Sequence, residues 1–104
     1  MTNDNFTITE EKTAGGIKLH IAGRINAFNA TTLQYKLDDT LRAGLNNIIL
    51  NMSQVLFLVS AGIRVLLMTY KKAEEAGGRL SVERPSENVR NVLGITALSE
   101  MLIE

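Results

Sequence analysis

Few side chains in this sequence are of the types that carry enzyme chemistry. The 104 residues include one histidine, His20, and no cysteine, which excludes thiolate catalysis, disulfides and zinc sites built from cysteines or several histidines. Several acidic residues are sequence neighbours, in the pairs Glu10-Glu11, Asp38-Asp39 and Glu74-Glu75. Because adjacent residues do not face each other across a cleft, these pairs are expected on solvated surfaces. The sequence predicts no catalytic residue, no cofactor and no metal site.

His20 lies in the segment GIKLHIAG, in which apolar and polar residues alternate. Alternate residues of a strand point to opposite faces, so Leu19 and Ile21 are predicted to face the core and His20 the outside. A catalytic base of the triad type needs a place in a pocket beside its nucleophile. One function to consider is a small hydrolase that uses Ser60 as its nucleophile. The sequence gives this hypothesis little support, since it places no base near this serine.

The composition is that of a globular domain with balanced charge. Hydrophobic residues make up 45% of the chain, and eleven basic residues balance eleven acidic ones. The basic residues are scattered, which argues against a nucleic-acid surface, and no apolar run approaches the roughly 18 residues of a membrane helix. The opening residues, MTNDNFTITEEK, lack the pattern of a signal peptide. We expect a single domain over residues 1–104, a cytoplasmic monomer without nucleic-acid or membrane partners.

Residue periodicity predicts a β-hairpin and a helix in the first half of the chain. Apolar and polar residues alternate over 6–10, paired glycines give a turn at 13–16, and a second strand follows over about 16–25. Leucines then recur every four residues between positions 33 and 41. This spacing predicts an amphipathic helix from residue 29 to about 44.

Strands and helices alternate in the second half. The helix predicted over 61–76 has a buried stripe at helical spacing, formed by Ile63, Leu66, Leu67 and Tyr70. This alternation after a hairpin predicts an α/β fold, with a mixed sheet covered by helices. In chain order we expect a strand at 47–50, a connector at 53–58, the helix at 61–76, a strand at 79–83, a helix N-capped by Ser86 and ending at Gly94, and a short strand at 101–103.

The segment from Asn51 to Lys72 resembles the signature of the STAS domain, the fold of bacterial anti-sigma factor antagonists. In that family a strand ending D-L-S is followed by a hydrophobic connector, by D-S-S/A/T-G, and by an apolar helix. This chain has N-M-S, V-L-F-L, V-S-A-G and I-R-V-L-L at the same places. The turn at 23–26, the glycines at 77–78 and the helix end at 92–96 also match the family in order and spacing.

The resemblance implies a phosphorylation switch at Ser60. In the family this serine is phosphorylated by a partner that is both a serine kinase and an anti-sigma factor. The unphosphorylated antagonist binds that partner and frees the sigma factor, and the phosphorylated form releases it. The residues alone give Ser60 a second interpretation, because a serine just before a helix is a common N-cap. A phosphate at a helix start is compatible with the fold, so a switch is expected to act on the interface.

Partner contacts are predicted around Ser60, because an apolar patch at a helix start suits a protein interface. We assign these contacts to residues from both helix starts: Asn26, Phe28, Val59, Ala61, Gly62, Val65 and Met68. For Val65 and Met68, which lie off the predicted buried stripe, the alternative is a wide buried face of the helix. For Ala61 and Gly62 the alternative is that small residues fit a tight helix start.

Three positions depart from the family pattern. The aspartate before the phosphoserine is Val59 here, and Asn51 and Asn26 replace two further aspartates of the motifs. We expect these changes to remove carboxylates that cluster around the serine. They motivate a second hypothesis, in which the chain is a STAS-like scaffold or transporter accessory subunit that binds its partner without phosphorylation.

Overall fold

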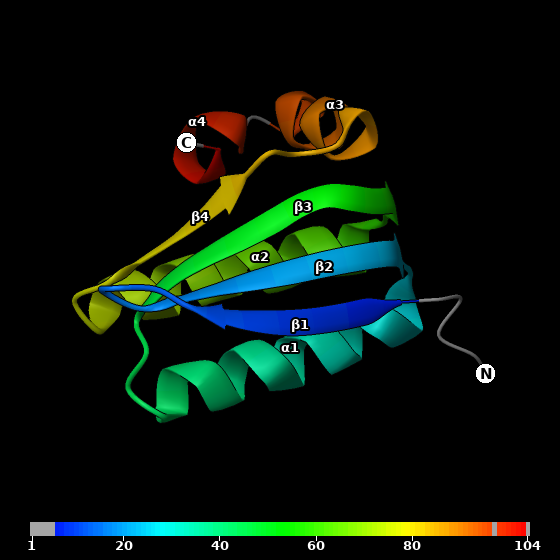
Figure 1. Cartoon of the computed structure of the whole chain (residues 1–104). Coiled ribbons are helices and arrows are strands. Elements are labelled where there is room, and N and C mark those ends of the chain that lie inside the picture. Colours follow the sequence, from blue (N-terminus) through cyan, green and yellow to red (C-terminus); the bar gives the residue numbers. More distant parts are fainter. Residues whose placement is uncertain (1–5, 97, 104) are drawn as a thin grey trace.

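The computed structural model describes residues 6–96 and 98–103. In these residues, one sheet has the order β1-β2-β3-β4, with β1 antiparallel to β2 and the other neighbours parallel. Its strands are β1 (Thr7–Lys12), β2 (Ile17–Ile25), β3 (Asn47–Leu58) and β4 (Arg79–Glu83). The helices are α1 (Ala27–Arg42), α2 (Ser60–Glu75), α3 (Glu87–Ile95) and α4 (Ser99–Leu102). The predicted α/β fold with a mixed sheet is confirmed (Figure 1).

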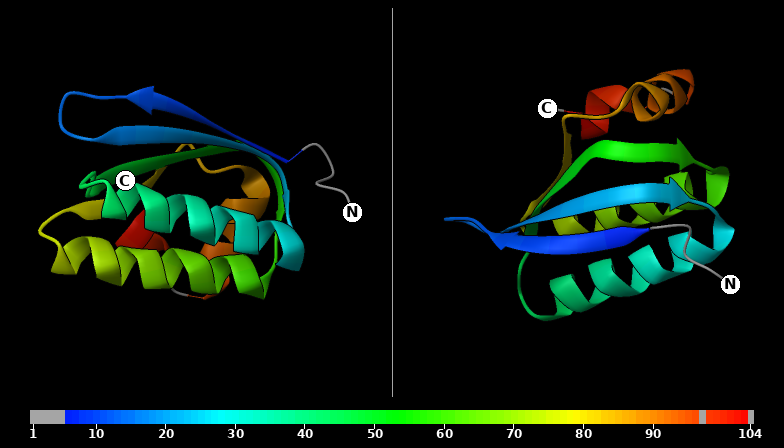
Figure 2. Two further views of the ribbon diagram at one scale, coloured as in Figure 1. Left: turned by 90° about the horizontal axis from the view of Figure 1, so that it is seen from below. Right: turned by 45° about the vertical axis from the view of Figure 1, so that its right-hand side comes forward.

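The helices cover the sheet unequally. α1 and α2 lie side by side along one face of the sheet (Figure 2). α3 and α4 lie at the side of the sheet that β3 and β4 form, away from β1 (Figures 1 and 2). Alternation in β2 places Leu19 and Ile21 in the core, as predicted, and α1 adds Leu33 and Leu37. The core between the sheet and the two long helices therefore holds α1 and α2 against the same face of the sheet.

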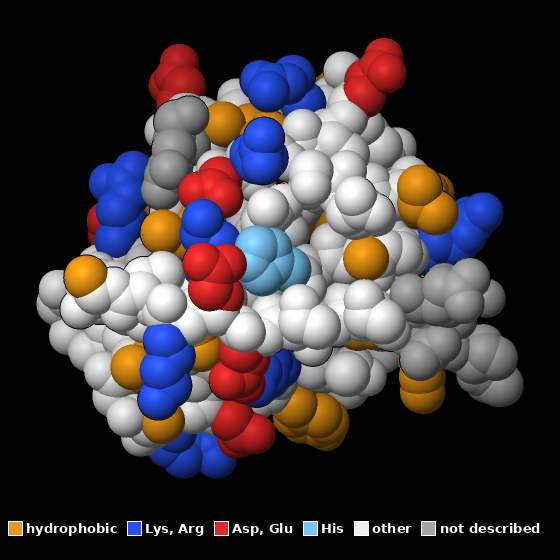
Figure 3. Space-filling view, viewed as in Figure 1, with side chains coloured by type: hydrophobic (Ala, Val, Ile, Leu, Met, Phe, Trp, Pro, Cys, Tyr) orange, Lys and Arg blue, Asp and Glu red, His pale blue; other side chains and the backbone are white. Residues whose placement is uncertain are grey.

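The face of the sheet turned away from α1 and α2 is polar. His20 Nε2 donates to Glu11 Oε1 over 2.7 Å, and Lys18 Nζ pairs with Glu83 Oε2 at 2.9 Å. Figure 3 looks onto this face and shows the histidine among acidic and basic side chains. The hydrogen bond from His20 lowers the pKa of Glu11 below its ordinary value. His20 thus lies on the outer face of its strand, as the alternation predicts.

The prediction of a connector at residues 53–58 was wrong. β3 runs without a break from Asn47 to Leu58, and four of its last five residues, all but Leu56, pair with residues 22–25 of β2. The register between the two strands shifts here, and Ser53 and Gln54 are consecutive exposed residues inside β3. A bulge of this kind breaks the alternation of a strand without ending it. As a result, β3 continues almost to the start of α2.

The prediction of a last strand at residues 101–103 was also wrong. This segment belongs mainly to the short helix α4, and Ile103 forms an isolated bridge with Val82 of β4. A run of three apolar residues fits either a strand or one helical turn, so periodicity does not separate them. The remaining element boundaries lie within two residues of the predictions. The N-cap prediction for Ser86 is confirmed, because its Oγ accepts from the Val89 N–H at 3.3 Å.

Candidate partner-binding site

The two long helices begin next to each other at one edge of the sheet. β2 and β3 are parallel, and their last residues, Ile25 and Leu58, are partners in the register. One residue later, the Val59 N–H donates to the Ile25 carbonyl oxygen over 3.1 Å. Candidate residues from the starts of α1 and α2 therefore lie on the same edge of the sheet (Figure 2).

The start of α1 is held by side-chain hydrogen bonds. Asn26 is the N-cap, and its Oδ1 accepts from the Asn29 N–H at 2.8 Å. Asn29 is fully buried, and its Nδ2 donates to the Arg24 carbonyl oxygen at 2.8 Å. These bonds join the end of β2 to the first turn of α1. Asn26 therefore has a structural role, and its contact with a partner stays a prediction.

The start of α2 has no side-chain cap. Val59 has an extended backbone and occupies the N-cap position, while Ser60 is the first residue of the helix. The prediction that Ser60 is the N-cap was therefore wrong by one position, because β3 continues to Leu58 and leaves Val59 as the single residue between strand and helix. Valine has no oxygen with which to accept a hydrogen bond. Ser60 is exposed to solvent.

Gly62 serves the packing of α2 onto the sheet. The glycine is buried, and a Cβ atom at this position would lie 2.6 Å from Leu58 Cδ1 and 2.8 Å from Ile25 Cγ2. Both distances are too short for normal contact, so a larger residue would push α2 away from the strand ends. The alternative stated for Gly62, a tight helix start, is the one that the geometry favours. Gly62 therefore has a structural role, and its contact with a partner stays a prediction.

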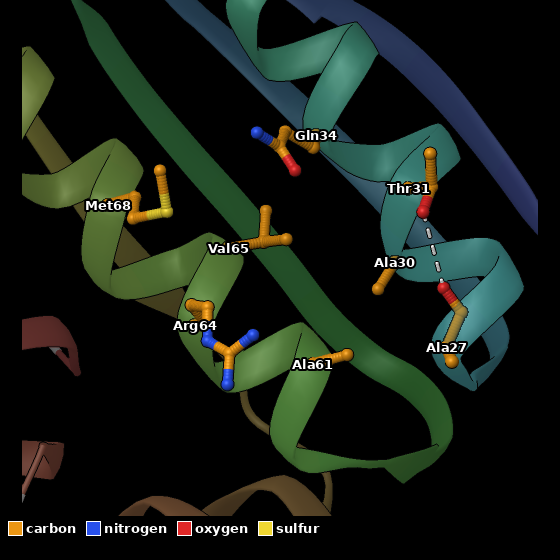
Figure 4. Close-up of a pocket in the computed structure, with 8 residues that line it drawn as sticks. All are labelled: Ala27, Ala30, Thr31, Gln34, Ala61, Arg64, Val65 and Met68. Atoms are coloured by element: carbon orange, nitrogen blue, oxygen red, sulfur yellow. Dashed lines mark hydrogen bonds between the residues drawn. The ribbon is translucent and has the colours of Figure 1, made fainter.

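A groove of about 170 Å³ lies between the first halves of α1 and α2. We call it the α1–α2 groove, and Figure 4 shows how side chains of the two helices line it. From α1 come Ala27, Ala30, Thr31 and Gln34, and from α2 come Ala61, Arg64, Val65 and Met68. Three of the predicted contact residues, Ala61, Val65 and Met68, are thus brought together here. Small and apolar side chains make most of its lining.

Val65 and Met68 have different environments. Val65 is 5% exposed and belongs to the core, so the prediction that it lies off the buried stripe was wrong. α2 packs against α1 as well as against the sheet. Its buried face therefore consists of Gly62, Val65, Leu66, Thr69 and Ala73. By contrast Met68 is 40% exposed, and Phe28, near the start of α1, is 64% exposed. These two exposed apolar side chains suit a protein interface.

Arg64 is the charged residue of the groove, and the sequence analysis did not single it out. It is exposed, and no carboxylate within residues 6–96 and 98–103 forms an ion pair with it. The signal that could have found it is its spacing of four residues from Ser60. In a helix, residues four apart lie on the same face.

Asn51 does not lie beside Ser60. Its register partner is His20, five residues before the end of β2, which corresponds to roughly 16 Å at about 3.3 Å per residue. Its Oδ1 instead accepts from the N–H and Oγ of Ser53, at 3.0 and 2.8 Å. The expectation that all three substituted positions surround the serine was therefore wrong for position 51. Positions 26 and 59 do lie at the neighbouring helix starts.

The site offers binding and modification chemistry. His20 lies well away from Ser60, in the middle of β2, so it cannot serve that hydroxyl as a base. Among the described residues, no group of three or more His, Cys, Asp or Glu could hold a metal ion. No helix in the same part of the chain is both long and apolar enough to cross a membrane. An exposed hydroxyl, an apolar groove and a guanidinium remain.

Comparisons with known proteins point to one family. Residues 7–103 match the family model of the STAS domain. The anti-sigma-B factor antagonist of Bacillus subtilis (strain 168) is 26% identical to this chain over 98 residues, which cover 94% of the chain and 89% of that protein. Its name describes a regulatory activity and not an enzymatic one.

Solved structures agree on the fold. A crystal structure of an anti-sigma factor antagonist from Mycobacterium paratuberculosis has a TM-score of 0.84 at 23% identity, over 98% of this chain and 87% of that one. The Bacillus cell fate determinant SpoIIAA in its phosphorylated form has a TM-score of 0.75 at 20% identity, over 94% and 91% of the two chains. These likenesses establish the arrangement of sheet and helices.

Proposed function

Because the chain belongs to the STAS domain family, we propose that it is an anti-sigma factor antagonist whose binding to an anti-sigma factor serine kinase is switched by phosphorylation of Ser60. The observation that carries the proposal is the exposed hydroxyl of Ser60 in the first turn of α2, next to the α1–α2 groove. It is supported by the B. subtilis relative, which is named as an anti-sigma-B factor antagonist. In this proposal the chain acts in the cytoplasm as a monomer.

Several exposed residues around Ser60 are suited to hold such a partner. Phe28 and Met68 expose apolar surface on the two helices, and Ala61 lines the groove between them. Apolar side chains of this kind provide the buried centre of an interface. Asn26 and Val59 complete the proposed contact surface at the two helix starts.

Phosphorylation of Ser60 would change this surface and leave the fold intact. A phosphate adds about −1.5 to −2 charges at pH 7. At the first residue of α2 it meets N–H groups that have no intrahelical acceptor and the positive end of the helix dipole, so the helix tolerates it. A partner that covers apolar side chains next to the phosphate must remove water from this charge, which weakens binding.

To test the proposal, the unmodified chain, Ser60→Asp and Ser60→Ala are each isolated from the native cells, and the partner proteins that co-purify with them are compared. We expect the unmodified chain and Ser60→Ala to retain an ATP-dependent serine kinase, and Ser60→Asp to lose it with an unchanged melting temperature. Thr32→Asp is the matched control, because it adds the same charge at an exposed position of α1. Equal recovery of the kinase by Ser60→Asp and Ser60→Ala would contradict the proposal.

The uncapped start of α2 favours one alternative. With Val59 in place of the family aspartate, the carboxylate next to the acceptor serine is absent. If a kinase needs that carboxylate to orient the serine, the chain is a STAS-like scaffold or transporter accessory subunit that binds without phosphorylation. In that case Ser60→Asp, Ser60→Ala and the unmodified chain recover the same partner, and this partner has no kinase activity.

A further inference from the structure

Arg64 and Ser60 lie one turn apart on the exposed side of α2. Residues four apart on a helix have Cβ atoms about 5–6 Å from each other. A long side chain at the later position points back toward the helix start, over the earlier one. Figure 4 shows this direction for Arg64, whose guanidinium extends along α2 toward Ala61 in the first turn. The guanidinium is thus within reach of a group attached to the Ser60 hydroxyl.

The charge of Arg64 is available to such a group. Among the other cations on the two long helices, Lys72 pairs with Asp38 at 3.2 Å and Arg42 with Asp39 at 3.4 Å, whereas Lys71 forms no ion pair with a described carboxylate. Arg64 forms no ion pair with any described carboxylate. It is also the one charged side chain among the residues that line the α1–α2 groove.

We propose that Arg64 is the internal counter-ion of a phosphate on Ser60 and joins that phosphate to the wall of the α1–α2 groove. The proposal rests on the proposed function in one respect, the choice of Ser60 as the phosphorylated residue. A guanidinium has several N–H donors in a planar fork and can donate two of them to one phosphate. Val59 contributes no carboxylate that would compete for these donors.

This contact would change the groove as well as the first turn of α2. Before phosphorylation, Arg64 gives the groove a positive wall that suits a partner segment with an apolar side chain and a nearby carboxylate. After phosphorylation, the guanidinium is engaged by the phosphate, and the net charge at this wall becomes negative. A single modification therefore removes an attractive group and adds a repulsive one.

The test uses the full chain with phosphoserine incorporated at position 60 during synthesis, so that neither kinase nor partner is needed. The second ionisation of the phosphate is followed by ³¹P NMR against pH, in the otherwise unchanged chain and in Arg64→Gln. An ion pair stabilises the dianion, so we expect its pKa to be lower by roughly 0.3–0.7 of a unit when Arg64 is present. The difference should shrink in 1 M salt, and Arg64→Lys should restore part of it.

Arg79→Gln is the matched control, because Arg79 is exposed at the start of β4, which pairs with the start of β3 at the opposite end from α2. The same phosphate pKa in Arg64→Gln and Arg79→Gln would overturn the inference about Arg64. That outcome is independent of the proposed function, which fails only if cells leave Ser60 unmodified or if the modification does not affect partner binding.

Discussion

The starts of α1 and α2 have almost the same backbone and very different side chains. Both N-cap residues are extended, Asn26 with φ −85° and ψ −176° and Val59 with φ −95° and ψ 172°. Asn26 accepts a hydrogen bond from the helix, and the buried Asn29 links that helix back to β2. Val59 makes no such bond, and the first helical residue after it is the exposed Ser60.

The first turn of α1 is thus capped by a side chain, whereas the first turn of α2 has no side-chain cap. At α1 the polar groups serve the fold. At α2 the fold relies on apolar packing at Gly62, and the polar hydroxyl of Ser60 is left on the surface. We infer that stability resides in the Asn26 cap and in the Gly62 contact, and that Ser60 is free to be modified.

The largest effect is expected at the packing contact of α2. Gly62→Ala would place a methyl group 2.6 Å from Leu58 Cδ1 and 2.8 Å from Ile25 Cγ2, and should reduce the free energy of unfolding by about 1–3 kcal/mol. Urea denaturation measures this change. Gly94→Ala in α3 is the control, because its Cβ meets no atom within 4 Å; it should keep or raise stability. Equal effects of the two substitutions would show that packing does not hold the start of α2.

The cap of α1 should contribute the next largest effect. Asn26→Ala removes the acceptor for the Asn29 N–H and should reduce the free energy of unfolding by about 1 kcal/mol. The measurement is again urea denaturation, with attention to an unchanged m-value. An unaltered midpoint would mean that the two helix starts do not differ in the way described.

A substitution that adds a cap residue should stabilise the start of α2. Val59→Asn puts a cap residue on an N-cap backbone that already has the required extended conformation. We expect the free energy of unfolding to rise by about 0.5–1 kcal/mol, since part of the cap energy is offset by lost apolar contact. Thermal unfolding would detect this gain, and a loss of stability would show that the Val59 side chain matters more to packing than the missing cap.

The smallest effect on stability is expected at Ser60 itself. The hydroxyl is exposed and caps nothing, so Ser60→Ala should change the free energy of unfolding by less than about 0.5 kcal/mol. If Ser60→Ala instead costs as much as Asn26→Ala, the hydroxyl has a structural role in the helix start. The comparison of these two variants in one denaturation series therefore separates structural from surface roles.

Most of the fold could be predicted from the sequence because its long elements have clear periodicity. The alternation over β2 and the leucine spacing in α1 each have one structural interpretation. The wrong predictions, a connector at 53–58 and a strand at 101–103, fall where the local sequence pattern fits more than one structure. Ser53 lies at a register shift inside β3, between the pairs His20–Asn51 and Ala22–Gln54. Such a bulge depends on the register of the neighbouring strand, which the sequence of one segment does not contain.

The candidate site was less predictable than the fold. The sequence placed Ser60 at the start of α2 to within one residue, but not the N-cap at Val59, because that depends on how far β3 continues. It did not show that Val65 is buried against the core, since this depends on α1 lying next to α2. Nor did it show that Asn51 is distant from Ser60, because β3 is longer than the four-residue strand predicted at 47–50.

The most direct test of the central claim is phosphosite mass spectrometry on the protein isolated from its native cells over several growth conditions. A strain with Ser60→Ala serves as control, and Ser53→Ala tests an exposed serine of the preceding strand. The account predicts phosphate on the peptide that contains Ser60, lost in Ser60→Ala and retained in Ser53→Ala. A complete absence of phosphate at Ser60 under every condition would contradict it.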